Sequence, residues 1–250
     1  MSIGFLDTTD LMVYGHEGWL EPSTTHVHEG DTVQLYFKWG HNMVSDGLAR
    51  MEGLSAFFVP PDGNQQELSI TDQKKDCYIF SMVPKTAGIY HFICKYTGSY
   101  VIDREGNYHP GNLKDYPDAQ HATLYTQFSH LSLQVGHQLP ENGLPEMPEL
   151  GLRLVPREWK RWRIGDEIVF NLQQGLNPLP HVKVNMAHAI DNGSEVRHKR
   201  LETDEHGNFS LKIEEAGRYL LIARHQSPEE EPDLYSDTHL TYTYFFSIKN

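Results

Sequence analysis

Short strand-like runs separated by turn signals constrain this chain more than any other feature of its sequence. Helical periodicity is almost absent, whereas runs rich in β-branched and aromatic residues recur along the whole length. Turn sequences such as Pro61-Asp62-Gly63 and Asp191-Asn192-Gly193 separate these runs. We expect strands at 32–38, 54–59, 77–83, 88–96, 121–135, 166–172, 182–188, 209–213, 218–224 and 238–248. The pattern predicts an all-β protein built from sandwiches or barrels, without βαβ units.

An internal repeat predicts how the strands are divided. Gly30-Asp31 in the first half and Gly165-Asp166 in the second half each open a strand. Likewise, Ala87-Gly88-Ile89-Tyr90 is matched by Ala216-Gly217-Arg218-Tyr219. Ala-Gly-x-Tyr suits a turn that enters a strand, where the tyrosine can hydrogen-bond backward as a corner. Two copies are too few for a solenoid, so we expect two tandem immunoglobulin-like or prealbumin-like β-sandwich domains.

The stretch between the two copies reads as a connection. It contains Pro140, Pro145 and Pro148 together with acidic residues, a composition that favours an extended chain. We therefore place an N-terminal sandwich at 1–138, a linker at 139–149 and a C-terminal sandwich at 150–250. Each half is long enough to bury a core of its own, so each is expected to unfold cooperatively by itself.

The charge balance excludes some partners. There are 34 acidic and 21 basic residues, for a formal net charge of −13, so nucleic acid is not an expected ligand. The one basic cluster, at 157–163, contains two tryptophans and is expected to be a solvated face at the domain junction. No apolar run is long enough to predict a membrane span, and residues 1–13 lack the features of a signal peptide.

Two further properties stay open at this point. Cys77 and Cys94 could form a disulfide or remain two buried free thiols. Exposed edge strands would allow a homodimer, although nothing in the sequence requires one.

The sequence carries none of the motifs that mark common enzyme classes. It contains no Gly-x-Ser-x-Gly elbow, no Gly-rich phosphate loop, no Cys-x-x-Cys pair and no His-Glu-x-x-His segment. We therefore do not expect an enzyme.

Histidine is the most unusual part of the composition, with 15 residues among 250. It is the commonest metal ligand in proteins. His26 and His28 would share one face of a strand, because side chains repeat every two residues; they could ligate an ion together or simply be solvated. His16, His41 and His121 each lie near a loop–strand junction, where sandwich proteins place functional residues.

Several motifs occur in the order and spacing of a known bacterial family. They are His16 followed by Leu20-Glu21-Pro22-Ser23, then Gly40-His41, Phe57 to Gly63, Gln120-His121-Ala122-Thr123, Leu152 to Pro156, Gly165-Asp166 and Thr203 to Phe209. On these motifs the chain, from His16 onward, resembles the nickel-uptake substrate-specific components, which are usually found outside the cytoplasm. One departure is Asn42-Met43, where the family has Pro-Phe after Gly-His.

The resemblance implies a metal site and its ligands. His16, His41 and His121 fall at histidine positions of the family pattern, and we expect them to converge at one end of the N-terminal domain as an open site. His26 and His28 are reserve ligands, and Asp118 is expected to orient His121 by accepting its ring N–H. The alternative is that the three histidines lie apart, each hydrogen-bonded or solvated.

Two functions follow. The first is an extracytoplasmic (periplasmic or cell-surface) metal-binding protein that assists uptake or handling of nickel- or cobalt-like ions, with a membrane transporter subunit as its partner. Imidazole ligands suit Ni²⁺, Co²⁺, Cu²⁺ and Zn²⁺. The second is an extracellular adhesion or recognition module that binds protein or glycan without metal, through aromatic residues of the loop 96–116.

Overall fold

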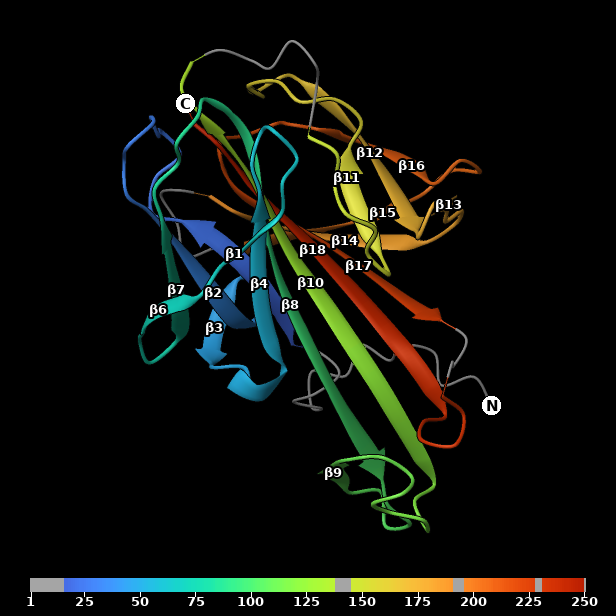
Figure 1. Cartoon of the computed structure of the whole chain (residues 1–250). Helices are drawn as coiled ribbons and strands as arrows, with labels where there is room; N and C mark the ends of the chain where they lie inside the picture. Colours follow the sequence, from blue (N-terminus) through green and yellow to red (C-terminus); the bar gives the residue numbers. More distant parts are fainter. Residues whose placement is uncertain (1–15, 138–144, 191–195, 228–230, 250) are drawn as a thin grey trace.

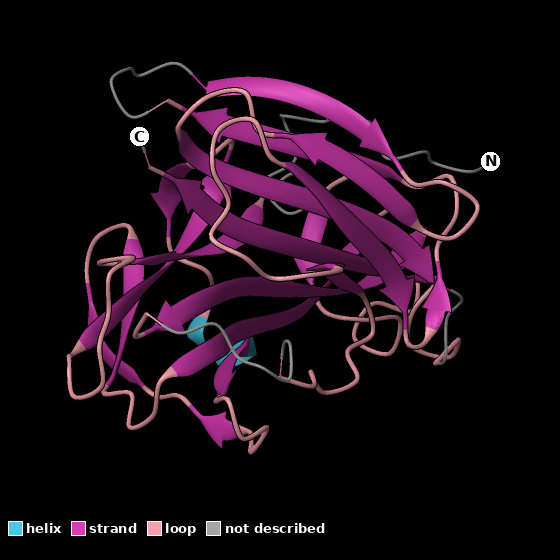
Figure 2. Ribbon diagram, turned by 90° about the horizontal axis from the view of Figure 1, so that it is seen from above, coloured by secondary structure: helices cyan, strands magenta, loops and turns pink. Residues whose placement is uncertain are grey.

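Strands make up almost all of the regular structure in a computed structural model of the chain (Figure 1). The structure describes all residues except 1–15, 138–144, 191–195, 228–230 and 250. Within the described residues the only helix is a single 3₁₀ turn, η1 (Met51–Gly53), drawn in cyan in Figure 2. The described part of the chain therefore holds no helix that is long and apolar enough to cross a membrane.

The strands form three sheets. The N-terminal outer sheet contains β1 (Glu17–Pro22), β2 (Val33–His41), β3 (Val44–Gly47), β6 (Ile70–Gln73) and β7 (Cys77–Met82). The C-terminal outer sheet contains β11 (Arg153–Pro156), β12 (Glu167–Gln174), β13 (Asn177–Pro178) and β16 (Asn208–Lys212).

The third sheet, which we call the central sheet, draws strands from both halves of the chain. The first half supplies β4 (Leu54–Val59), β5 (Gln66–Glu67), β8 (Gly88–Ile102), β9 (Tyr108–Pro110) and β10 (His121–Val135). The second half supplies β14 (Lys183–Ala189), β15 (Val196–Glu202), β17 (Gly217–Ser227) and β18 (Asp237–Ile248). The order β15-β14-β17-β18-β10-β8-β4-β5 joins the halves where β18 pairs in parallel with β10, from Thr123↔Asp237 to Leu131↔Phe245.

The two outer sheets cover opposite faces of the central sheet. In β17, Leu220 and Ile222 pack in the core under the N-terminal outer sheet, while Tyr219 and Leu221 pack in the core under the C-terminal one. Successive side chains of a strand point to opposite faces, so both faces of the central strands are buried. The molecule is thus layered, with β1, β2 and β7 on one side and β11, β12 and β16 on the other (Figure 1).

A twofold relation between the halves accounts for this arrangement. The pairings β1-β2-β7 and β4-β8-β10 of the first half correspond to β11-β12-β16 and β14-β17-β18 of the second half. A twofold rotation about an axis along the strands makes the meeting strands parallel and turns the sheet over. Each half therefore places its outer sheet on the opposite face.

The predicted fold class is confirmed. All ten predicted strands lie on observed strands, and both predicted tyrosine corners are present. The Tyr90 hydroxyl donates to the Thr86 carbonyl over 3.1 Å, and the Tyr219 hydroxyl donates to the Glu215 carbonyl over 2.7 Å.

The expectation of one separate core per half is wrong. Ala187, Leu220 and Phe245, all from the second half, lie in the core under the N-terminal outer sheet. Ile93 and Phe128, from the first half, lie in the other core. The cores are shared because the halves share the central sheet. The domain boundaries themselves stay a prediction; residues 138–144 of the linker region and the turn at 191–193 lie outside the described residues.

Shared cores predict that the whole chain unfolds as one unit. Leu220 and its neighbour Leu221 are both fully buried but face different cores. Either Leu220→Ala or Leu221→Ala should cost about 2–5 kcal/mol of unfolding free energy and lower one common transition in differential scanning calorimetry. Two resolved transitions, each moved by only one of the variants, would contradict the shared-core arrangement.

Candidate metal centre

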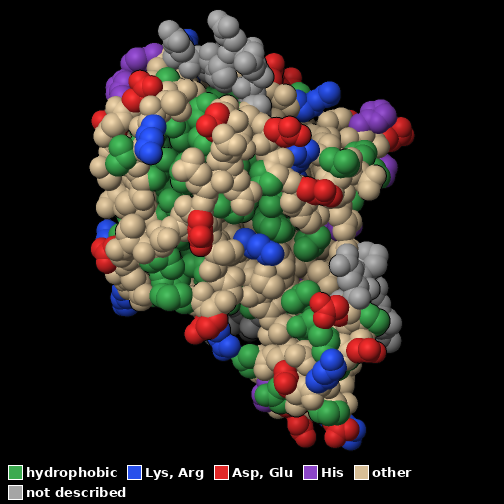
Figure 3. Space-filling model, in the orientation of Figure 1, with side chains coloured by type: hydrophobic (Ala, Val, Ile, Leu, Met, Phe, Trp, Pro, Cys, Tyr) green, Lys and Arg blue, Asp and Glu red, His purple; other side chains and the backbone are tan. Residues whose placement is uncertain are grey.

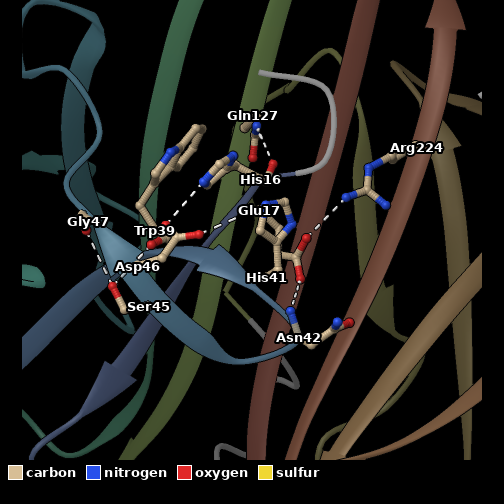
Figure 4. A network of polar contacts seen from close by, with 10 residues as sticks. All are labelled: His16, Glu17, Trp39, His41, Asn42, Ser45, Asp46, Gly47, Gln127 and Arg224. Atoms are coloured by element: carbon tan, nitrogen blue, oxygen red, sulfur yellow. Dashed lines mark hydrogen bonds and ion pairs between the residues drawn. The ribbon is translucent and has the colours of Figure 1, made fainter. Parts of the chain in front are cut away.

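Two histidines and an aspartate meet at one end of the N-terminal outer sheet (Figure 4). His16 directly precedes β1, His41 ends β2 and Asp46 lies in β3. His16 Nε2 is 3.1 Å from Asp46 Oδ1, and His41 Nε2 is 4.0 Å from Asp46 Oδ2. The two imidazole centroids are 4.1 Å apart, and one ligand atom from each residue lies within 4.8 Å of the others. We call this cluster the β1–β3 site.

A two-residue turn holds His41 beside Asp46. Asn42 and Met43 connect β2 to β3 with φ angles of 54° and 62°, as a type I′ hairpin turn requires. Asparagine adopts this conformation readily, whereas it costs a methionine about 1–2 kcal/mol. The Met43 side chain is buried in the core, and that burial offsets the cost. Backbone strain is thus concentrated between two of the three ligands, as is common at functional sites.

The glycine before His41 allows β3 to approach β2. The register shifts between Trp39 and Gly40, which marks a β-bulge. A Cβ atom on Gly40 would overlap the carbonyl oxygen of Val44. The glycine of the Gly40-His41 pair is therefore required because a side chain at this position would clash with β3.

His16 is held from two sides. Its ring stacks on Trp39, with centroids 5.7 Å apart and planes inclined by 11°. Its backbone carbonyl accepts a hydrogen bond of 2.9 Å from Gln127 Nε2 of the central sheet, and Gln127 Oε1 accepts from the Gly18 N–H. With only 5% of His16 exposed, its imidazole is fixed before any ion binds.

A buried carboxylate lies next to the ligands. Glu17 Oε1 accepts the Asn42 N–H over 2.8 Å, and Glu17 Oε2 is 3.1 Å from Arg224 Nη2 on β17. Burial raises the pKa of Glu17 above its usual value, although Arg224, the Asn42 N–H and His41 act against this rise. Because Glu17 is paired with Arg224, the carboxylate of Asp46 is the negative charge that remains to face a bound cation.

The donor atoms fit a first-row transition-metal ion. Metal–nitrogen bonds of about 2.1 Å place neighbouring ligand atoms about 3.0–3.4 Å apart and opposite ones about 4.2 Å apart. The separations of 3.1 Å and 4.0 Å to the two Asp46 oxygens fall in this range. Two imidazoles and one carboxylate leave coordination positions for water or another ligand.

The structure brings together only two of the three histidines that we expected to converge. His121 starts β10, six residues of strand from Gln127, which is about 20 Å at 3.3 Å per residue. Its Nε2 instead lies 3.1 Å from Asp237 Oδ2, and Asp237 also contacts His239. The convergence of His121 with His16 and His41 is therefore wrong, because β10 is long and straight enough to carry its first residue away from the site.

Asp118 does not orient His121. It forms an exposed ion pair with Arg104, with 2.9 Å between Asp118 Oδ1 and Arg104 Nη2. His121 finds its carboxylate on β18 because the parallel pairing places Asp237 beside the start of β10.

The reserve ligands form a cluster of their own. His26, His28 and His137 are all exposed, with one ligand atom of each within 4.8 Å of the others. We call this cluster the three-histidine site. Sequence reasoning missed His137, which follows β10, and Asp46, which lies in a short hairpin strand. For Asp46, the signal was its position five residues after His41, across a turn.

The two cysteines do not form a disulfide. Cys77 lies in the N-terminal outer sheet and Cys94 in the central sheet; both are buried and free. Burial raises the pKa of both thiols, which suits inert core residues.

Two other histidines belong to a buried network. His91 Nδ1 and His130 Nε2 are 3.0 Å apart, and both contact Ser132 Oγ. Tyr242 and Tyr244 complete the network through His130 Nδ1 and Ser132. Burial lowers the pKa of His91 to about 4 and the pKa of His130 well below its usual value, so both imidazoles are neutral near pH 7.

Fold and site together define a layered β-sandwich protein with a candidate histidine–carboxylate metal centre. The chain belongs to the family described as domain of unknown function (DUF4198), whose model matches residues 13–227. No curated protein matches the chain.

Three solved structures show weak overall similarity to the chain. A DUF4785 family protein from Legionella pneumophila has a TM-score of 0.30 and 9% identity over 82% of this chain and 51% of that chain. Escherichia coli alpha-2-macroglobulin has a TM-score of 0.31 and 12% identity over 94% of this chain and 20% of that chain. Two fibronectin type-III domains of chicken tenascin have a TM-score of 0.26 and 9% identity over 92% of this chain and 98% of that chain. The chain thus spans about half of the first protein and a fifth of the second.

Steric crowding at the bulge gives a first test of the site. Gly40→Ala should lower the free energy of unfolding by about 1–3 kcal/mol, because the added methyl group meets the Val44 carbonyl. Gly47→Ala on β3 is the matched control, since no atom beyond its own chain neighbours lies within 4 Å of its Cβ position, and should change stability by less than about 0.5 kcal/mol. Urea unfolding measures both; equal effects would mean that the bulge does not require glycine.

The buried histidine pair predicts a specific pH dependence of stability. Histidine in the unfolded chain titrates near 6.5, whereas the pKa of His91 is about 4 in the folded chain. As the pH falls, the unfolded state therefore binds protons before the folded state does. The contribution of the neutral imidazoles to the free energy of unfolding is fully present above pH 6.5 and is lost as the pH falls toward 4. At about 1.4 kcal/mol per pKa unit, the loss should reach several kcal/mol. Urea unfolding from pH 7 to 4.5 should show this decline, and His130→Gln should flatten it; a flat profile for the unmodified protein contradicts the assignment.

Proposed function

We propose that this protein binds a first-row transition-metal ion at the β1–β3 site and takes part in the uptake or handling of such ions. The observation that carries the proposal is the meeting of His16, His41 and Asp46, from three neighbouring strand segments, with ligand atoms within 4.8 Å of one another. Their supports, the stacked Trp39 and the strained turn, hold the ligands in place before an ion arrives.

The ligand set favours a particular class of ion. Ca²⁺ and Mg²⁺ take oxygen ligands, whereas imidazole nitrogen suits Ni²⁺, Co²⁺, Cu²⁺ and Zn²⁺. The resemblance to nickel-uptake components supports nickel or cobalt as the ion in the cell, an extracytoplasmic location and a membrane transporter subunit as partner. With three protein ligands, open positions remain through which such a partner could accept the ion.

The adhesion alternative needs an exposed aromatic surface, and three of the four tyrosines in the segment 96–116 pack inward; Tyr116, stacked on His109, is the one that is exposed. Tyr96 and Tyr100 are 4% and 3% exposed, and both rings pack against Tyr125 of β10. Tyr108 packs on Tyr100 in turn, with 5.5 Å between ring centroids. These tyrosines stabilise the long β8–β10 extension, and we propose metal binding alone.

Ligand removal tests the proposal. Protein purified without an affinity tag should bind one Ni²⁺ fewer per chain after His41→Ala or Asp46→Ala, measured by equilibrium dialysis and elemental analysis. His198→Ala is the control, because His198 is exposed on β15, between Arg197 and Lys199, which oppose a cation. Equal losses from His41→Ala and His198→Ala would mean adventitious surface binding and would overturn the proposal.

A pH titration provides an independent check on the ligand type. Imidazole binds metal only when neutral, so occupancy should fall between pH 7.5 and pH 5. Equal occupancy at the two pH values would contradict imidazole ligation.

A further inference from the structure

We propose that His26, His28 and His137 form a second, solvent-facing metal site that takes a borderline divalent ion such as Cu²⁺, Zn²⁺ or Ni²⁺ through imidazole nitrogens alone. The site shares its chemistry with the β1–β3 site but none of its residues. Exposed histidines gather at the upper left of the surface in Figure 3, where Figure 1 shows the loop that follows β1.

Backbone contacts bring the three residues together from distant parts of the chain. Val27 forms a parallel bridge with Val135 at the end of β10, and the Gly136 N–H donates to the Val27 carbonyl over 2.8 Å. The bridge places His26 and His28, which flank Val27, beside His137. Val27 and Val135 are buried in the core, so the backbone that carries the ligands is anchored although the ligands are exposed.

The nitrogen positions match those around a metal ion. His28 Nε2 and His137 Nε2 are 3.1 Å apart. With metal–nitrogen bonds of about 2.1 Å, this separation falls between about 3.0 Å for a right-angled pair and about 3.4 Å for a tetrahedral pair. The His26 ring lies 4.6 Å from His28 and 5.5 Å from His137, between ring centroids, which puts a third imidazole in reach.

Asp31 helps to set the tautomer of His28. Its Oδ2 accepts the His28 backbone N–H over 2.7 Å and lies 3.6 Å from His28 Nδ1. A carboxylate near Nδ1 favours the proton on that nitrogen, which leaves the Nε2 lone pair directed at His137 and at an ion between them. At 3.6 Å the Asp31 carboxylate is beyond hydrogen-bond distance of Nδ1 and acts on the His28 ring through its charge.

Charges around the cluster predict a weaker site than the β1–β3 site. His26 also lines a cavity of about 320 Å³ whose other lining residues include Lys160, Arg161, Arg163 and Lys249. These cations oppose a bound metal ion, and Asp31 does not belong to the ligand group, whereas Asp46 does. The three-histidine site should therefore fill second. The two sites lie beyond opposite ends of β1, about 20 Å apart for six residues, so each should bind without altering the other.

Removal of individual ligands from the full chain tests the second site. Untagged protein titrated with Cu²⁺ should bind two ions in two phases, measured by equilibrium dialysis with elemental analysis. His28→Ala and His137→Ala should each weaken the second phase at least tenfold and leave the first unchanged. In the His41→Ala variant the second phase should persist, with a Cu²⁺ electron paramagnetic resonance spectrum that shows coupling to two or three nitrogens.

The control variant is His206→Ala, an exposed turn histidine that belongs to neither cluster, and it should change neither phase. If His28→Ala and His137→Ala leave both phases intact, the second site does not exist, whatever the outcome at the β1–β3 site. If instead His41→Ala alone has no effect, the proposed function fails while the second site stands. If His206→Ala weakens binding as much as His28→Ala, the ions bind adventitiously to surface histidines and the second site is overturned.

Discussion

The parallel pairing of β10 with β18 is the interaction on which the rest of this structure depends. It joins two half-sheets into one. Without this pairing, each half-sheet would present a long edge of unpaired backbone groups to solvent. It also creates central strands that are covered on both faces, because the two outer sheets lie on opposite sides. Polar residues of these strands consequently need internal partners. Thr123 donates to Asp237, Thr243 donates to the Gly18 carbonyl, and His130 bonds to Tyr242.

The candidate metal centre is connected to this shared sheet through ion pairs in which the glutamate is buried and the arginine is partly exposed. β1 carries Glu17 and Glu21, and β17 of the other half supplies Arg224 and Arg218 to them. Lys38 of β2 also contacts Glu21, over 3.0 Å. Because Glu17 and Glu21 are buried, loss of their partners would leave an uncompensated charge, so these contacts hold β1 in place over the central sheet. His16 precedes β1 directly, and its position is therefore set by residues more than 200 positions away.

Sequence reasoning succeeded where local chemistry decides the structure. Strands rich in apolar residues, such as β4 and β10, have the predicted bounds, and the two Ala-Gly-x-Tyr segments form the predicted corners. It missed β1 because two glutamates interrupt the apolar pattern, and the partners that accompany their burial include arginines from β17, far away in the sequence. It missed the short β3, and with it Asp46, since a four-residue strand gives little periodic signal.

The sequence by itself determined the all-β class, the repeat and the position of His41 at a strand end, because alternation and turn chemistry act within a few residues. Only the tertiary structure decided which histidines share a site. His41 meets His16 through strand pairing, His121 is carried away along β10, and His137 reaches His26 and His28 through a bridge between Val27 and Val135. Which residues form a ligand set depends on which strands lie side by side. The local pattern of residues along the chain does not show which strands will pair. The joining of the halves into one sheet was likewise decided only by the tertiary structure, because it results from pairing between strands that are more than 100 residues apart.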